Sequence, residues 1–336
     1  MLQKILRDLL VLSFISSAFS AGGQGMCVLF VSNSFRGFHF GKVDFIAKKL
    51  EDIMPLPLQL TGAEGGCAAG ADEGVFFIPN ANVAYNFLYE VNIIKNSTTS
   101  RTISPPSQYK GTIPAFYTMQ TNNNDDLWTI FEESSSISWV AAATVFPVEN
   151  GTSSAISANF ASQWLSFQWR KAGVATVDTK RNLFYFVAGV GTAGVETLIG
   201  VPVGDSTKPV KFVEHAGPSG NSSDIDFLGY SAPLDIFVAS CFSINTGIGS
   251  IKTMPADGSK GWSTVYVWGI GKETSMELGN AAITADGKIF YVAMDSGASG
   301  YPQYFQFDLT TNKLVNNFVI SANDWPGLIT AEVVAC

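Results

Sequence analysis

The segment GVGTAG at residues 189–194 has the glycine spacing of a dinucleotide-binding loop. In such a loop a helix must follow, because the N–H groups at its N-terminus bind the pyrophosphate. Here the next residues, VETLIGVPV, have the composition of a strand. The context therefore contradicts nucleotide binding, and we interpret the segment as a loop between two strands.

Histidine chemistry is restricted, because the chain contains only two histidines, His39 and His215. Two histidines exclude a multi-histidine zinc site. A Ser-His-acid triad stays open, but no G-x-S-x-G segment supports it. We interpret each histidine as a surface or loop residue rather than as a general base.

Residues with side-chain oxygen atoms are better candidates for a metal site than the two histidines. Lys171, Asp224 and Glu277 follow one another at intervals of 53 residues. Asp226 lies two residues after Asp224, on the same face of an extended strand. Carboxylate and amide oxygens are the ligands that calcium prefers, and Asn280 is a further candidate. Two interpretations follow: a calcium site at Asp224, Asp226, Glu277 and Asn280, or a solvated ring of opposite charges that includes Lys171.

Aromatic side chains are concentrated in ANFASQWLSFQWRK, at residues 158–171. Aromatic and arginine side chains are the usual anchors of molecular recognition. The alternative is that these aromatic side chains only pack over the ends of neighbouring sheets. The residues that we consider for ligand binding are Arg36, Tyr109, Trp164, Trp169, Arg170 and Trp325.

Short strands, rather than helices, must position these residues. Residues 279–314 contain the runs AAIT, KIFYVAM and QYFQFDL, and a fourth run, VNNFVIS, follows the polar turn TTNK. Asp286-Gly287 suits a tight hairpin turn, which needs residues that tolerate positive φ. This pattern predicts a four-stranded antiparallel meander. The run KIFYVAM is apolar on both faces, so both must be covered.

The sequence contains a repeat, and neighbouring copies of the unit can cover both faces of this strand. The meander aligns with segments 53 and 106 residues earlier, which places Phe184, Phe237 and Phe290 in one column, and weaker copies lie further upstream. Four-stranded repeats of this length, arranged radially, are blades of a β-propeller. We predict an all-β fold, a six-bladed propeller of four-stranded antiparallel blades. The expected single domain covers 21–336, with blades at 26–60 plus 328–336, 61–105, 110–157, 168–215, 224–269 and 277–321.

The two ends of the domain predict how the ring closes. The first unit begins at its second strand, MCVLFVS, and the chain ends with a spare strand, LITAEVVAC. Pairing of these two segments would complete the first blade and remove open edges. It would also bring together Cys27 and Cys336, which we predict to form a disulfide. We expect Cys67 and Cys241 to stay unpaired, because their blades oppose each other across the ring.

At ITADGKIFYVAMDSG and FQFDLTTNKL the chain resembles the six-bladed propellers that include NHL-repeat, YVTN-repeat, strictosidine-synthase-like and gluconolactonase-like proteins. The resemblance implies an architecture and selects no single family. Lactonase-like members hold calcium in the central channel with acidic and Asn residues. Residues 257–262, DGSKGW, also partly resemble the Asp-box turn of sialidase-type propellers. That box is a structural turn, and the few arginines of this chain argue against sialidase chemistry.

The N-terminus has the layout of a secretory signal peptide at residues 1–20, with a basic start, a short apolar core and the cleavage pattern AFS. In a secreted protein, the three sequons at Asn96, Asn150 and Asn221 are candidate sites of N-linked glycosylation. The net charge of −8 argues against nucleic acid or anionic lipid as the main partner.

Together these features predict a secreted glycoprotein propeller that binds a protein, peptide or glycan ligand at one mouth of its channel, since propellers are scaffolds on which function is added locally. One alternative is a calcium-assisted hydrolase of the lactonase or strictosidine-synthase-like type. Another is a structural component of the extracellular matrix. No catalytic residue is assigned, and calcium is the only cofactor considered.

Overall fold

The computed structural model describes residues 25–336 except for several internal segments. These segments are 35–36, 58–67, 71, 73, 83–84, 103–118, 122–126, 133–139, 146–152, 159–174, 191–194, 203–212, 218–223, 244–247, 270–280, 297–300, 322 and 327. The regular elements of the described residues are all strands, which pair into six sheets of four.

Sheet one contains β24 (Ile329–Ala335), β1 (Met26–Val31), β2 (His39–Asp44) and β3 (Lys49–Pro55). Sheet two contains β4 (Ala68–Ala69), β5 (Val75–Asn82), β6 (Tyr85–Asn92) and β7 (Ser97–Thr102). Sheet three contains β8 (Met119–Thr121), β9 (Leu127–Glu132), β10 (Val140–Val145) and β11 (Ser153–Ala158). For sheet three the structure describes the backbone pairing alone.

The other three sheets follow in chain order. Sheet four contains β12 (Ala175–Asp178), β13 (Leu183–Val190), β14 (Val195–Pro202) and β15 (Val213–Ala216). Sheet five contains β16 (Asp224–Ser231), β17 (Ile236–Ser243), β18 (Ile248–Pro255) and β19 (Ser263–Gly269). Sheet six contains β20 (Ala281–Ile283), β21 (Ile289–Ser296), β22 (Tyr301–Asp308) and β23 (Lys313–Val319), which is the predicted meander.

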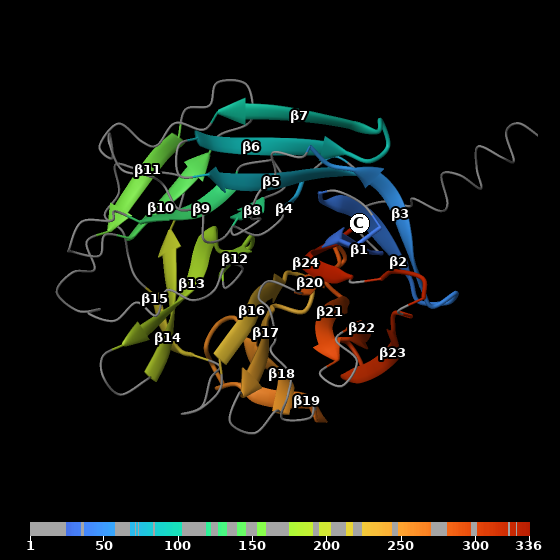
Figure 1. Ribbon diagram of the computed structural model, residues 1–336. Coiled ribbons are helices and arrows are strands. Elements are labelled where there is room, and N and C mark those ends of the chain that lie inside the picture. Colours follow the sequence, from blue (N-terminus) through green and yellow to red (C-terminus); the bar gives the residue numbers. More distant parts are fainter. Residues whose placement is uncertain are drawn as a thin grey trace, which may run out of the picture.

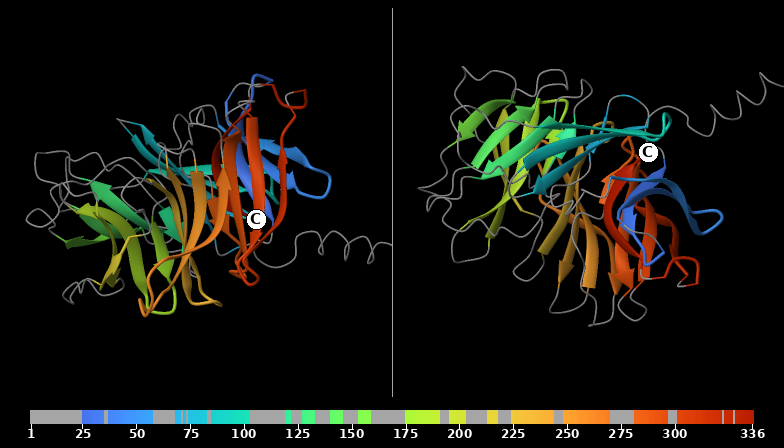
Figure 2. Two further views of the ribbon diagram at one scale, coloured as in Figure 1. Left: turned by 90° about the horizontal axis from the view of Figure 1, so that it is seen from below. Right: turned by 45° about the horizontal axis from the view of Figure 1, so that its top comes forward.

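The sheets are arranged radially. Figure 1 shows the first strand of each sheet at the centre and the fourth strand at the rim, and Figure 2 shows the same ring from two other directions. Each inner strand contacts the next, from β4 through β8, β12, β16 and β20 to β24, and β24 contacts β4 in turn. The fold is thus an all-β propeller of four-stranded antiparallel blades, as the repeat predicted.

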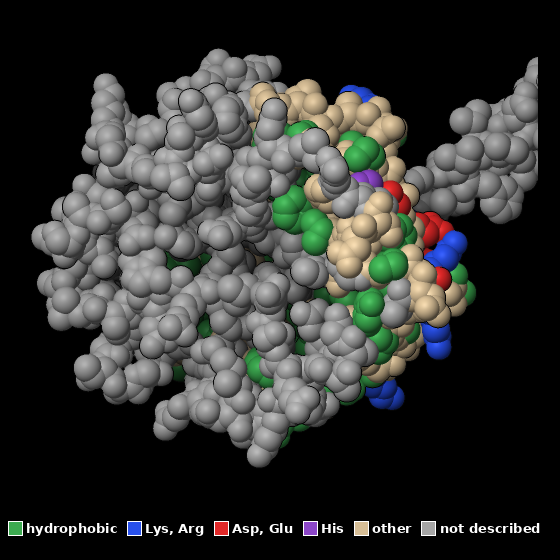
Figure 3. Space-filling view, in the orientation of Figure 1, with side chains coloured by type: hydrophobic (Ala, Val, Ile, Leu, Met, Phe, Trp, Pro, Cys, Tyr) green, Lys and Arg blue, Asp and Glu red, His purple; other side chains and the backbone are tan. Residues whose placement is uncertain are grey.

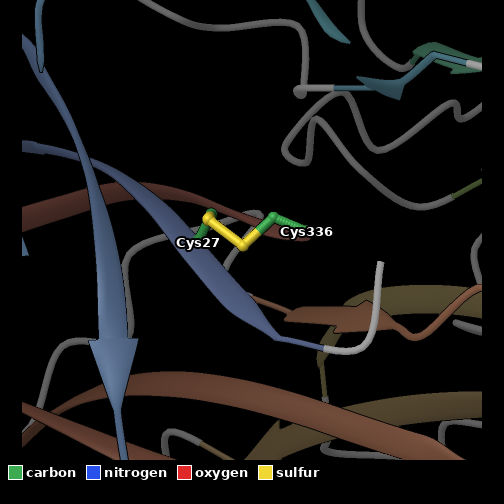
Figure 4. The surroundings of a disulfide bond; sticks show 2 residues. All are labelled: Cys27 and Cys336. Carbon is green, nitrogen blue, oxygen red and sulfur yellow. A yellow bond between two sulfur atoms is a disulfide. The ribbon is translucent and has the colours of Figure 1, made fainter. Parts of the chain in front are cut away.

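The C-terminal strand closes the ring, as predicted. β24 pairs antiparallel with β1, so that Met26 lies opposite Ala335 and Cys27 opposite Val334. Cys27 and Cys336 form a disulfide with their Cα atoms 5.6 Å apart (Figure 4). The N–H group of Gly25 donates to the carbonyl of Cys336 at 2.7 Å, and the Cys336 N–H group donates back to Gly25 at 3.0 Å. Residues 25–27 and Cys336 are therefore held together where other sheets have a hairpin turn.

Neighbouring sheets cover each other's apolar faces. Phe184, Phe237 and Phe290, the predicted column, are all fully buried. The ring of Phe290 lies 5.4 Å from that of Phe227 in sheet five. The ring of Phe237 packs edge-on against Tyr185 of sheet four at 4.6 Å. Burying a side chain of this size stabilises the fold by about 1.5–3 kcal/mol, which explains why the second strands are apolar on both sides.

One end of the propeller is built from short turns, and we call it the turn face. In several of these turns an Asp or Asn at the end of a strand accepts hydrogen bonds from backbone N–H groups two or three residues later; these capping residues are Asp44, Asn92, Asp178 and Asp308. The turns end on a residue with positive φ, namely Lys48, Asn96, Asn182, Asp235 or Asn312. A short polar side chain favours that conformation, and four of the five are Asn or Asp.

The opposite end is the connection face, because antiparallel strands return the chain there after every turn. The fourth strand of each sheet ends at this face, and the first strand of the next sheet begins there. The disulfide lies at the turn face, since it takes the place of a turn between first and second strands.

Candidate functional site

Most of the predicted site residues lie outside the described residues. These are Arg36, Tyr109, Trp164, Trp169, Arg170, Lys171, Glu277 and Asn280, together with Cys67 and the sequon residues Asn150 and Asn221. The ligand-binding and calcium interpretations at these residues stay predictions.

Asp224 and Asp226 lie in β16, of which the structure describes the backbone at both positions. Asp224 is the first residue of this inner strand and pairs with Phe242. The register with β17 shifts between Ile225 and Phe227, so that Asp226 has no partner in the ladder. A bulge interrupts strict alternation. The expectation that both carboxylates share one face, which depended on alternation, therefore does not follow from the strand.

Trp325 is the one ligand-binding candidate with a described side chain. Its indole N–H group donates to the carbonyl of Leu50 at 3.2 Å, and its ring packs edge-on against Phe30 at 5.4 Å. Both partners belong to sheet one, and the half-buried ring also joins the core between sheets one and six. This geometry favours the interpretation in which Trp325 packs between blades.

The connection face also contains a pair of residues, His39 and Asp52, that the sequence analysis did not predict. His39 begins β2 and is buried, and its Nδ1 lies 3.0 Å from both carboxylate oxygens of Asp52 in β3. A carboxylate that orients an imidazole in this way is one part of a general-base arrangement. The same contact also joins the third and fourth strands of sheet one. The sequence interpretation of His39 as a surface or loop residue is wrong, because the side chain is buried in a strand.

A cluster of polar side chains lies at the turn face, between sheets four and five. Arg181 Nη1 donates to Asp178 at 2.7 Å and to Asp235 at 2.8 Å, and Nη2 donates to the other oxygen of Asp235 at 2.9 Å. The hydroxyl of Tyr230 donates to Asp235 at 2.9 Å. Asp178 is fully buried and also caps its own turn. We call these four residues the hairpin network.

Ionisation in the hairpin network follows from these contacts. The hydrogen bond from Arg181 lowers the pKa of Asp235 to about 2, and the two carboxylates raise the pKa of Arg181 above its ordinary value. Burial, together with the hydrogen bond to Asp235, raises the pKa of Tyr230 well above its usual range. Each charge is matched by a partner, so the cluster suits a staple between two blades better than a proton-transfer site.

The turn that resembles an Asp box packs against the same region. Asp257 accepts a hydrogen bond from the Ser259 N–H group at 2.9 Å, and the indole N–H group of Trp262 donates to Ala216 of sheet four at 2.7 Å. Gly258 has a φ of 70°, and a Cβ placed there would lie 2.5 Å from His215. The turn therefore has a structural role, as its likeness to the box implied.

His215 lies in β15, stacked on Tyr185 at 6.0 Å. Its Nε2 atom is buried and has no hydrogen-bond partner among the residues that the structure describes. Burial lowers the pKa of His215, with a smaller effect from Arg181, and burial raises the pKa of Tyr185 to about 12. The neutral imidazole is thus the stable form in the fold, which makes His215 a packing residue in this setting.

Acidic and basic side chains lie close together on one part of the described surface. In Figure 3 these acidic and basic side chains lie over the region of β2 and β3. Lys49 and Glu51 form an ion pair in this area, beside His39 and Asp52. Within the described ranges, groups of three or more His, Cys, Asp or Glu arranged to hold a metal ion are absent, and so is a helix able to cross a membrane.

Comparison with known proteins supports the fold. No protein-family model and no curated protein sequence matches the chain. The solved structures that resemble it include TolB from Acinetobacter baumannii, with a TM-score of 0.57 and 8% identity, covering 94% of this chain and 68% of that one. A chain of a nidogen/laminin complex has a TM-score of 0.53 and 11% identity, with 93% and 99% covered. The periplasmic gluconolactonase of Pseudomonas aeruginosa has a TM-score of 0.51 and 10% identity, with 87% and 95% covered. At such identities the likeness establishes a β-propeller fold alone.

Proposed function

We propose that this chain is a secreted glycoprotein propeller that binds a protein, peptide or glycan ligand at its connection face. One observation carries the proposal: the ring is closed covalently by Cys27–Cys336, while every passage between sheets leaves from the opposite end. A rigid scaffold that presents loops at one end is a common basis for recognition. Trp325 is described at that end, and the other candidate ligand-binding residues lie outside the described residues.

Secretion is supported by the closing disulfide, because such bonds form and persist in oxidising compartments. It is supported independently by residues 1–20, whose pattern is that of a signal peptide. Under this proposal residues 21–336 are a single mature domain. N-terminal sequencing of the secreted protein tests it, with a mature end near Ala21 as the expected result.

The number of blades belongs to the proposal as well. We propose that all six sheets, including sheet three, act as blades of one ring. The cycle of contacts from β4 to β24 supports this count. Pairs of cysteines introduced into β8 and β12 should cross-link under oxidation if sheet three stands between sheets two and four. Failure of that cross-link, with a positive β12–β16 control, would count against the sixth blade.

Two observations favour a protein as the binding partner. The nidogen/laminin complex shows that a chain of this shape was solved in a complex between two proteins. The net charge of −8 argues against nucleic acid and anionic lipid. Arrays of extracellular proteins and glycans should therefore give a signal that Trp164→Ala and Trp169→Ala reduce. Ile46→Ser, which alters an exposed side chain at the turn face, is the matched control. Equal signals for all variants would exclude this surface.

A calcium-assisted hydrolase of the lactonase type is the second candidate. Asp224 begins an inner strand at the connection face, and a bulge follows it; bulges often lie beside active sites. The structural similarity to the periplasmic gluconolactonase of Pseudomonas aeruginosa also favours this candidate. Calorimetry on EDTA-treated protein tests this candidate. A binding heat that is lost in Asp224→Asn would support it, and the absence of both heat and a melting shift would reject it.

A further inference from the structure

Asn96 occupies a special place in the turn between β6 and β7. It is the last residue of the turn, exposed, with a φ of 48°. The turn itself is held by Asn92, whose carboxamide oxygen accepts a hydrogen bond from the Lys95 N–H group at 2.8 Å. Because Asn92 supplies the cap, the side chain of Asn96 is not needed to hold the turn.

The residues after Asn96 distinguish this turn from its equivalents. Asn182 and Asn312 have the same left-handed conformation, but neither has a hydroxyl residue two positions later. Asn96 is followed by Ser97 and Thr98. Thr98 lies in β7, the outer strand of its sheet, where it pairs with Val91 on one side only. An enzyme can therefore reach the acceptor asparagine and its hydroxyl residue from the rim of the propeller.

An exposed apolar side chain belongs to the same turn as the acceptor asparagine. Ile94, two residues before Asn96, keeps 57% of its surface exposed. Gly74 supports it from behind, since a Cβ at Gly74 would lie 2.8 Å from Cγ1 of Ile94. Exposed isoleucine on a turn is unfavourable in water, so a covering group would stabilise it.

We propose that Asn96 carries an N-linked glycan whose first sugar packs on Ile94. In the transfer step the Nδ2 atom of Asn96 bonds to the anomeric carbon of an oligosaccharide. The bond from that carbon to a lipid pyrophosphate breaks, the lipid pyrophosphate leaves, and the amide loses one proton. The inference goes beyond ligand binding and rests on the proposed secretion. It places a glycan on the turn face of sheet two, away from the proposed ligand.

Peptide mapping of the full chain from a secreting eukaryotic host tests the modification. After peptide N-glycosidase F in isotope-labelled water, we expect Asn96 to be recovered as labelled Asp in wild type, Thr98→Ser and Asn312→Gln, and as unmodified Asn in Thr98→Ala. The same sample also shows whether the leader (the predicted signal peptide, residues 1–20) has been removed and whether the Cys27–Cys336 disulfide has formed. An unmodified Asn96 in protein with the leader removed and the disulfide formed overturns the inference and leaves secretion intact. A retained leader with reduced cysteines overturns both.

Thermal unfolding tests the contact with Ile94. Removing the glycan should lower the melting temperature of the wild type and of Ile46→Ala, and should lower that of Ile94→Ala by less than half as much. Ile46 is the matched control, because it holds the equivalent position in the β2–β3 turn, is 95% exposed, and has no sequon beside it. An equal loss in all three proteins overturns the contact.

Discussion

Arg181 and Asp235 form a two-point ion pair across the boundary between sheets four and five, with N–O distances of 2.8 and 2.9 Å. The two residues lie in equivalent turns of neighbouring blades. A bidentate pair is directional as well as charged, so it defines the angle between the two sheets at the turn face. Ser231 makes a similar link to the next blade, since its hydroxyl donates to the carbonyl of Gly287 at 2.6 Å. These contacts join the turns of sheets four, five and six at the turn face.

The first prediction concerns the hairpin network. Arg181→Met leaves the buried carboxylate of Asp178 without its cation and should lower the free energy of unfolding by about 1–3 kcal/mol. Denaturant titration measures the loss. Lys180→Met is the control, because Lys180 is exposed and lies 3.9 Å from Asp235. It should cost less than about 0.5 kcal/mol. Equal effects of the two variants would contradict a special role for Arg181.

The second prediction is an acid dependence of stability. The pKa of Asp235 falls from 3.8 to about 2 in the fold, because Arg181 favours the carboxylate. A group with a lowered pKa contributes stability that is fully present above its unfolded pKa and is lost as the pH falls through the folded pKa. The wild type should therefore lose stability between about pH 4 and pH 2 more steeply than Asp235→Asn. Melting curves across that range measure the difference, and parallel curves would refute it.

The third prediction concerns ring closure. Cys27 and Cys336 are 309 residues apart, so their bond restricts almost the whole unfolded chain. Replacing both by Ser should lower the free energy of unfolding by about 2–5 kcal/mol. Equilibrium denaturation measures the effect. Reducing agent should destabilise the wild type and leave the double variant unchanged. A wild type that is insensitive to reduction would show that β24 is held by its strand pairing alone.

The fourth prediction compares two glycines in one turn. Gly258 has a φ of 70° and faces His215, so Gly258→Ala combines backbone strain with a steric clash. We expect a loss of about 1–3 kcal/mol. At Gly261 a Cβ would meet nothing within 4 Å, so Gly261→Ala should be close to neutral. Thermal unfolding of the two variants distinguishes them, and similar melting temperatures would contradict the packing of this turn against β15.

Much of the fold could be predicted from patterns among residues that are close in the sequence. The runs AAIT, KIFYVAM, QYFQFDL and VNNFVIS are strands of one sheet, because side-chain alternation and turn chemistry are properties of adjacent residues. The spare C-terminal strand and the pairing of Cys27 with Cys336 followed from counting strands. Most of the predicted site residues lie outside the described residues and stay predictions. His39 proved to be buried beside Asp52, and the bulge at Asp226 interrupts the alternation that was used to place two carboxylates together.

The sequence alone determined the strands, their turns, the propeller and the residues that close it, since these depend on periodicity and on short-range chemistry. Only the tertiary structure decided which side chains meet across blades. The spacing between Arg181 and Asp235 signals equivalent turns, but contact also needs the angle at which two sheets pack. The indole of Trp325 meets Leu50 after a separation of 275 residues. Such contacts are set by packing of whole blades, which no local pattern encodes.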